Sequence, residues 1–209
     1  MTAAKKGHFT MASKARSVLA GALASVLALT GCISLGGKAP PSLLTLTSSA
    51  SAAVGSGAQG GAASAIAVLE PGAPQSINVV RVPVQVDNAE IAYLKDAVWV
   101  EKPARLFQRL LAETIRARTG RLVVDGETPS IGAATRLQGA IGAFGYDART
   151  SSVIVRFDAV RTLPGDNVVT RRFEAVVPGV AAEAGPVGRA LNEAANQVAG
   201  EVATWVSGG

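Results

Sequence analysis

Nucleophilic and metal-binding side chains are scarce in this chain of 209 residues. It contains one cysteine, Cys32, and one histidine, His8, which precedes that cysteine. A Ser-His-Asp triad or a Cys-His dyad needs a histidine in the folded protein, and structural zinc sites need several histidine or thiolate ligands. No glycine-rich phosphate-binding motif opens a helix either. The sequence therefore excludes these enzyme classes and predicts neither a metal ion nor a cofactor.

Paired carboxylates are the remaining candidates for acid–base chemistry. The pairs are Asp87 with Glu90 and Asp125 with Glu127, and Asp166 is a further candidate calcium ligand. Hydrolysis of this type needs two carboxylates that flank the scissile bond, and a calcium loop needs oxygen ligands at regular spacing. Short acidic pairs in turns are usually solvated. We therefore predict that the protein is not an enzyme and that it has no metal site.

Cys32 ends a segment that has three parts. The first part is basic, the second is an apolar run at positions 18–29, and the third is Thr30-Gly31-Cys32. As a helix, the apolar run is about 18 Å long, which is well short of the roughly 30 Å hydrocarbon core of a bilayer. This length is typical of a signal peptide rather than of a transmembrane helix. We predict a signal peptide at residues 1–31.

The sequence Leu29-Thr30-Gly31-Cys32 resembles the bacterial lipobox. The resemblance implies cleavage after Gly31, a diacylglyceryl group on the Cys32 thiol and an acyl chain such as palmitate on the new amine. Several acyl chains give stable membrane anchoring, whereas one chain is marginal. The alternative is a buried structural cysteine. Ile33 is not acidic, which favours the inner leaflet of the outer membrane, facing the periplasm; the inner membrane is the alternative.

The charge balance argues against nucleic acid as a partner. The whole chain has a formal net charge of +5. Four of its 20 basic residues precede Cys32, so removal of residues 1–31 leaves 16 basic and 15 acidic residues. A nearly neutral chain lacks the basic surface that binds phosphate backbones.

The chain after Cys32 reads as a tether and one domain. Residues 32–41 form the tether, and residues 42–207 form the domain, which includes a flexible Ala/Ser/Gly excursion at about residues 49–65. Apolar periodicity predicts one helix that begins at Pro103 and ends before Gly120, and a second from about Pro186 to Val206. Alternating patterns predict strands at residues 42–47, 77–82, 89–94, 121–124, 135–146, 151–163 and 169–177.

Together these elements predict a mixed α/β fold of α+β type. We expect a single layer of mostly antiparallel sheet, with the two amphipathic helices packed on one face. Leu137, Ile141 and Ala143 are expected on the buried face of one strand. Trp99 and Tyr93 are candidates for a partner surface, because aromatic residues are enriched at interfaces; the alternative for both is the core.

Two stretches resemble a known family. Trp99-Val100-Glu101-Lys102-Pro103 is similar to the Trp-x-Glu-x-Pro entry to a helix in ABC-type transport auxiliary lipoproteins, the PqiC-like group. The segment from Ala190 to Trp205 resembles the closing helix of that family. The order of strands and the lipobox agree with the family pattern.

The resemblance implies a non-catalytic accessory of an ABC transport system that moves lipid between membranes. Its implied partners are a permease, an ATPase and an MCE-domain protein that spans the periplasm, which the lipoprotein would dock at the membrane. A homo-oligomer is possible. Alternative functions are a carrier with a lipid pocket between helices and sheet, and a structural lipoprotein of envelope assembly.

Overall fold

A computed structural model describes residue 2 and residues 42–125, 132–165 and 167–208. Apart from residue 2, the predicted signal peptide therefore lies outside the described residues, as do Cys32, the tether, Glu127 and Asp166. Within the described part of the chain, no helix is long and apolar enough to cross a membrane.

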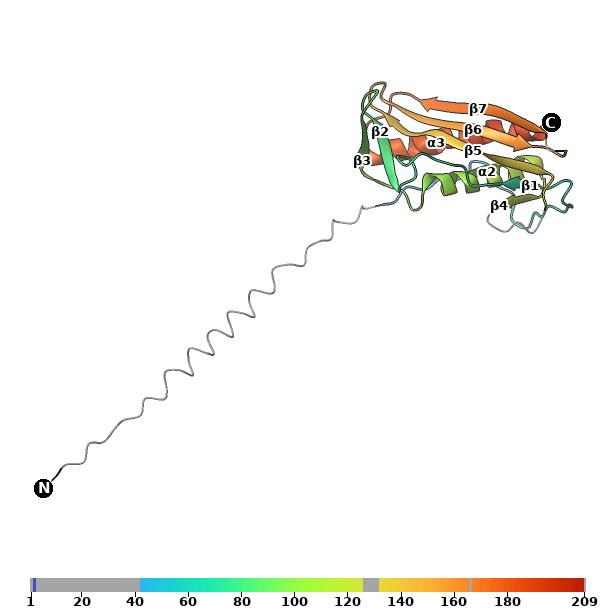
Figure 1. Cartoon of the computed structure of the whole chain (residues 1–209), viewed down its shortest axis with the longest axis horizontal. Coiled ribbons are helices and arrows are strands. Elements are labelled where there is room, and N and C mark those ends of the chain that lie inside the picture. Colours follow the sequence, from blue (N-terminus) through green and yellow to red (C-terminus); the bar gives the residue numbers. More distant parts are fainter. Residues whose placement is uncertain (1, 3–41, 126–131, 166, 209) are drawn as a thin grey trace. The chain divides into compact units, whose positions relative to one another are not determined.

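A curled sheet of seven strands forms one layer of the domain (Figure 1). Strand β5 lies at its centre and forms an antiparallel meander with β6 and β7. On its other edge, β5 pairs in parallel with β1 near its start and with β2 near its end. Strand β4 pairs with β1 in parallel, and β3 pairs with β2 in the antiparallel direction. The strands are β1 Ile66–Val68, β2 Arg81–Gln85, β3 Ile91–Val98, β4 Val123–Asp125, β5 Thr135–Asp147, β6 Ser152–Thr162 and β7 Val168–Val177.

The antiparallel ladders are the long ones, and the parallel ladders span only two or three residue pairs each. The predicted mostly antiparallel sheet is therefore confirmed. The parallel pairing of β1 with β4 and β5, and of β2 with β5, was not predicted, because these ladders contain too few residues for a pairing pattern to be visible.

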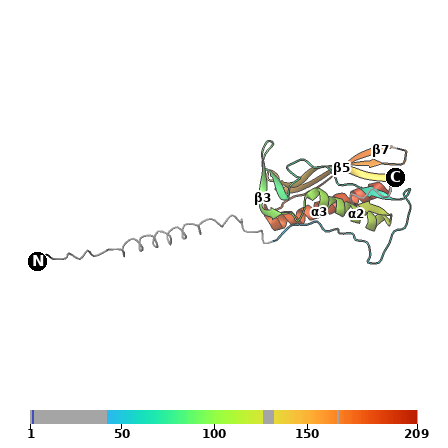
Figure 2. The same ribbon diagram turned by 60° about the horizontal axis from the view of Figure 1, so that its bottom comes forward.

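Two helices lie side by side against one face of this sheet (Figure 2). They are α2, Pro103–Thr119, and α3, Ala184–Ser207. Proline stands at the first position of α2, where its missing N–H costs no hydrogen bond, and Gly120 ends the helix in the left-handed conformation. Both predicted helices are confirmed, and the mixed α/β fold class with them.

The core fills the space between the helices and the sheet. Its centre is a chain of edge-to-face aromatic contacts from Trp99 to Phe144, Phe107 and Phe157, with ring centroids 5.4–6.1 Å apart. Each of these four side chains is at most 1% exposed. Valine, leucine, isoleucine and alanine from both helices complete the core, as the aromatic-poor composition requires.

A bulge at Gly142 changes which residues of β5 face the helices. Before the bulge, Thr135, Leu137 and Ile141 are buried, whereas Phe144 and Tyr146 are buried after it. The ladder with β6 shifts register between Ile141 and Ala143, so one extra residue enters β5 there. The expectation that Ala143 lies on the buried face is therefore wrong, because simple alternation cannot detect an inserted residue.

Two predicted strands differ from the structure near the start of the domain. Of residues 42–47, only Leu44 forms a bridge, with Trp99. The strand predicted at residues 77–82 begins at Arg81 instead and continues through Pro83. Residues 74–78 form a turn closed on the carbonyl of Pro74. Pro83 is tolerated because pairing with β5 begins only at Val84.

Residues 43–52, here called the strap, run along the two helices. Asn192 and Asn196 of α3 hydrogen-bond the backbone of Thr47 and Ser49 at 2.7–2.9 Å. On α2, the Glu113 carboxylate accepts a hydrogen bond of 2.8 Å from the backbone N–H of Ala52. The strap is thus held largely by polar side chains of the helices, and the segment predicted to be an excursion begins within it.

Candidate functional site

The two aromatic residues predicted for a partner surface have different environments. Trp99 is 1% exposed and packs against Phe144, so it belongs to the core, as the alternative interpretation holds. Tyr93 is half-buried on the edge strand β3, and the guanidinium of Arg81 lies 3.9 Å from its ring centroid. Of these two residues, only Tyr93 is therefore accessible to a partner.

Asp87 and Asp125, one from each predicted acidic pair, have different structural roles, and Glu127 lies outside the described residues. Asp87 accepts hydrogen bonds from the backbone N–H groups of Ala89 and Glu90, which is a capping role in the β2–β3 turn. Asp125 forms an ion pair with Arg116, with 3.4 Å between Oδ1 and Nη2. Among the described residues, no group of three or more His, Cys, Asp or Glu side chains could hold a metal ion.

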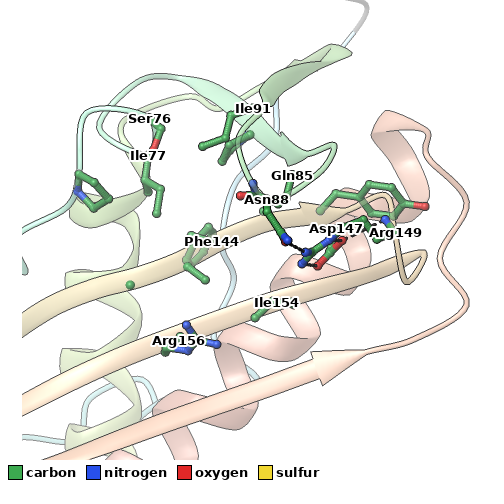
Figure 3. A pocket seen from close by; sticks show the side chains of 16 residues that line it. Ser76, Ile77, Gln85, Asn88, Ile91, Phe144, Asp147, Arg149, Ile154 and Arg156 are labelled. Carbon is green, nitrogen blue, oxygen red and sulfur yellow. Dashed lines mark hydrogen bonds and ion pairs between the residues drawn. The ribbon is translucent and has the colours of Figure 1, made fainter.

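A pocket of about 390 Å³ opens on the sheet face that is turned away from the helices (Figure 3). Its floor is Gly142, Ala143 and Gly145 of β5. The bulge places Gly142 and Ala143 next to each other on this face, so two adjacent positions carry almost no side chain. The pocket thus follows directly from the bulge and from the small residues around it.

The walls of the pocket come from three separate segments. Ile77 belongs to the turn before β2, Ile91 begins β3, and Ile154 lies on β6. Ile91 is 46% exposed, whereas Ile77 is buried. These side chains give the middle of the pocket an apolar lining.

One end of the pocket is closed by a hydrogen-bonded bridge between two hairpins. Arg149, in the β5–β6 turn, makes a paired contact with the Asp147 carboxylate at 2.9 and 2.6 Å. Its Nη1 also donates to Oδ1 of Asn88 in the β2–β3 turn at 2.5 Å. The side-chain hydrogen bond from Arg149 lowers the pKa of Asp147, although burial opposes the shift. Asp147 therefore stays ionised and holds the guanidinium in place.

Arg156 of β6 marks the other end, with Ile154 between it and Arg149 (Figure 3). It forms an ion pair through Nε with Glu174, its direct partner on β7. One step further along the same two strands, Arg172 pairs with Asp158 in the same cross-strand manner, with 2.5 Å between Nε and Oδ1. Arg172 does not line the pocket. The two pairs differ in three respects. The arginine lies on β6 in one pair and on β7 in the other, Arg172 makes a second hydrogen bond of 3.0 Å to Oδ2 of Asp158, and of the two arginines only Arg156 lines the pocket.

The pocket is suited to binding rather than to acid–base catalysis. It combines apolar side chains with two guanidinium groups, and its carboxylate, Asp147, has a pKa shifted away from neutrality. The lipid carrier considered as an alternative function would have its pocket between the helices and the sheet. In the structure, that space is occupied by the packed core. The pocket over Gly142 lies on the opposite face of the sheet.

Sequence reasoning missed Arg149, Arg156 and Asn88. In the sequence, Asp147 to Thr150 are only the connection between the strands predicted at residues 135–146 and 151–163. The available signal was the pair of small residues at 142 and 143 inside a long strand, which indicates a bulge or a close approach. The convergence of three distant segments leaves no local pattern.

Comparison with known proteins identifies one family model. The model of the ABC-type transport auxiliary lipoprotein component matches residues 44–203, which is most of the described domain. A comparison with curated proteins found no match.

The fold is shared with solved structures whose TM-scores are 0.60 and 0.61. A Xanthomonas campestris protein of the DUF330 family has a TM-score of 0.61 and 16% identity, over 80% of this chain and 92% of that chain. An uncharacterized protein has a TM-score of 0.60 and 11% identity, over 70% and 93%. PelC of Paraburkholderia phytofirmans, solved as a dodecamer, aligns with a TM-score of 0.40 and 15% identity, over 70% and 90%.

Proposed function

Because the chain belongs to the ABC-type transport auxiliary lipoprotein family, we propose that it is a non-catalytic accessory of an MCE-type lipid transport system. In this proposal it docks the periplasm-spanning MCE-domain protein at the membrane and so supports the permease and ATPase. The observation that carries the proposal is the family match across residues 44–203, together with a lipobox-like sequence that ends at Cys32.

The proposed anchor is Cys32, cleaved after Gly31 and acylated. The ten residues from Cys32 to Pro41 form the tether that joins it to the domain. Fully extended, this tether reaches about 35 Å. The domain would therefore stay close to its membrane, which we propose to be the outer membrane, and would meet a partner that crosses the periplasm.

Tyr93 is the remaining candidate for a contact with the partner. It lies on β3, an edge strand of the sheet, and keeps part of its ring accessible beside Arg81. Exposed strand edges and accessible tyrosines are common features of protein interfaces.

Copurification tests the proposal. Membranes from cells that produce the full chain with a C-terminal tag are solubilised, and the bound proteins are identified by mass spectrometry. We expect an MCE-domain protein together with permease and ATPase subunits. Recovery of none of them, from cells in which all are produced, would contradict the proposed docking role.

A matched variant tests the anchor separately. Cys32→Ser cannot be alkylated by the lipid donor, since the reaction requires a thiolate. We expect it to keep an uncleaved signal peptide and to carry no acyl mass, whereas the wild type gains both acyl modifications. An unmodified thiol in the wild type would contradict the anchor even if the copurification succeeded.

A second candidate function, a lipid carrier, is favoured by one specific observation. This is the pocket over Gly142, Ala143 and Gly145, which combines an apolar middle with guanidinium groups at its ends.

A further inference from the structure

The pocket on the open sheet face contains a cation whose hydrogen-bonding capacity is only partly used. Arg156 donates from Nε to Glu174. Among the residues that the structure describes, neither of its Nη groups makes a hydrogen bond. At the other end of the pocket, Arg149 is committed to Asp147 and Asn88 through three of its donors. Arg156 is therefore the group that is available to an anion.

The apolar part of the pocket lies directly beside this cation. Ile154 precedes Arg156 by two residues on β6, so both side chains point to the same sheet face. Ile91 reaches the same space from β3 while keeping 46% of its surface exposed. A ligand that covered Ile91 and Ile154 would remove apolar surface from water, which is favourable at about 25 cal/mol per Å².

We propose that this pocket binds an anionic phospholipid, with the phosphate on Arg156 and part of one acyl chain over Gly142, Ala143 and Ile154. The lipid identity rests on the transport function proposed above, whereas the chemistry, an anion joined to an alkyl chain, rests on the pocket alone. Free phosphate would leave the isoleucines in water, and a neutral alkyl chain would leave the Nη groups of Arg156 without an acceptor.

Gly142 keeps the floor of the pocket open. The atoms nearest to a Cβ at this position would belong to the flexible side chain of Arg156, with Cδ at 3.3 Å, and to the carboxylate of Asp158, at 3.8 Å. A larger side chain here therefore occupies the pocket without striking the backbone. By contrast, a Cβ at Gly145 would overlap the carbonyl oxygen of Pro83, so that glycine is required by the fold.

The test uses the full lipidated chain in phosphatidylcholine nanodiscs, with octyl phosphate as the probe. Hydrogen exchange in peptides covering residues 72–91 and 142–156 reports binding at the pocket, independently of partitioning into the bilayer. Inorganic phosphate and octyl glucoside are titrated in parallel, because they carry the head group or the alkyl chain alone. We expect saturable protection by octyl phosphate and at least tenfold weaker effects of the other two compounds.

Three variants locate the site. Arg156→Gln removes the proposed phosphate ligand and should weaken octyl phosphate binding about tenfold, as expected for one charge-assisted hydrogen bond. Gly142→Val should weaken it by filling the floor. Arg171→Gln is the control, since it removes a positive charge at an exposed position of β7 that does not line the pocket, and it should bind like the wild type.

Several results would overturn the proposal. These are no protection of the wild type by octyl phosphate, equal protection by octyl glucoside or by inorganic phosphate, or an equal loss in Arg156→Gln and Arg171→Gln. Copurification of the transport subunits is scored on the same variants. If the subunits copurify but octyl phosphate does not bind, the proposed ligand site is rejected and the docking role stands. If octyl phosphate binds but no subunit copurifies, only the docking role is rejected.

Discussion

Arg161, in β6, donates a hydrogen bond of 2.7 Å from Nη1 to the carbonyl oxygen of Trp205, in the last turn of α3. The same nitrogen reaches the carbonyl oxygen of Val206 at 3.2 Å, and the guanidinium lies 4.7 Å from the Trp205 ring centroid. Helix α3 has no basic residue of its own in its last turn. A buried arginine of the sheet thus satisfies carbonyl groups that a helix end leaves without partners.

Replacement of this arginine should loosen the end of α3. Arg161→Met keeps much of the apolar volume but removes the charge and both hydrogen bonds, so we expect a loss of about 2 kcal/mol in the free energy of unfolding. Urea denaturation measures it. Arg171→Met, at an exposed position of the neighbouring strand β7, is the control and should change stability by less than about 0.5 kcal/mol. Equal effects of the two substitutions would contradict the capping role.

Two glycines of β5 should respond differently to the same substitution. A Cβ at Gly139 would overlap the carbonyl oxygen of Asp158, and its φ of +157° is one that other residues rarely adopt. We expect Gly139→Ala to cost about 3 kcal/mol or more, because the β5–β6 ladder must shift. Gly142→Ala should cost less than about 1 kcal/mol, since only the flexible Arg156 side chain must move. Thermal unfolding of both variants tests this difference, and a reversed order would contradict the assigned bulge.

The strap should detach when its contact with α3 is removed. Asn196 accepts a hydrogen bond from the backbone of Ser49 and donates one to the carbonyl of Thr47. Asn196→Ala removes both, and we expect roughly tenfold faster hydrogen exchange in residues 47–52, with global stability lowered by less than about 1 kcal/mol. Gln197→Ala, which alters an exposed contact with Glu201, should leave the strap unchanged. Unaltered exchange in Asn196→Ala would show that other contacts hold the strap.

The sequence predicts this fold where one rule governs a long element. Residues 153–162 alternate without interruption, and Val153, Val155 and Phe157 all face the helices as expected. The same rule fails in β5, because the extra residue at Gly142 exchanges the two faces halfway along the strand. The burial of Phe144 follows from that exchange and could not be predicted from alternation.

The candidate site was less predictable than the fold. Its residues are supplied by a turn near Ile77, by β3 at Ile91 and by β6 at Arg156, and their proximity depends on long-range pairing with β5. Trp99 illustrates the opposite problem. Its residue type suits an interface as well as a core, and only its burial against Phe144 decides between them.

The bridge that closes the pocket should make stability depend on pH. The hydrogen bond from Arg149 lowers the pKa of Asp147 in the folded protein. As the pH falls, the Asp147 carboxyl is therefore protonated first in the unfolded chain, where its pKa has the ordinary value of about 3.9. The contribution of Asp147 is therefore fully present above about pH 5 and is lost as the pH falls through the lowered folded pKa. We expect the stability difference between wild type and Asp147→Asn to shrink as the pH falls through this range.

An NMR titration of the Asp147 carboxyl should show its pKa rising in Arg149→Gln but staying low in Asn88→Ala, which removes only the contact of Arg149 with the other hairpin. An unchanged pKa in Arg149→Gln would assign the shift to another group.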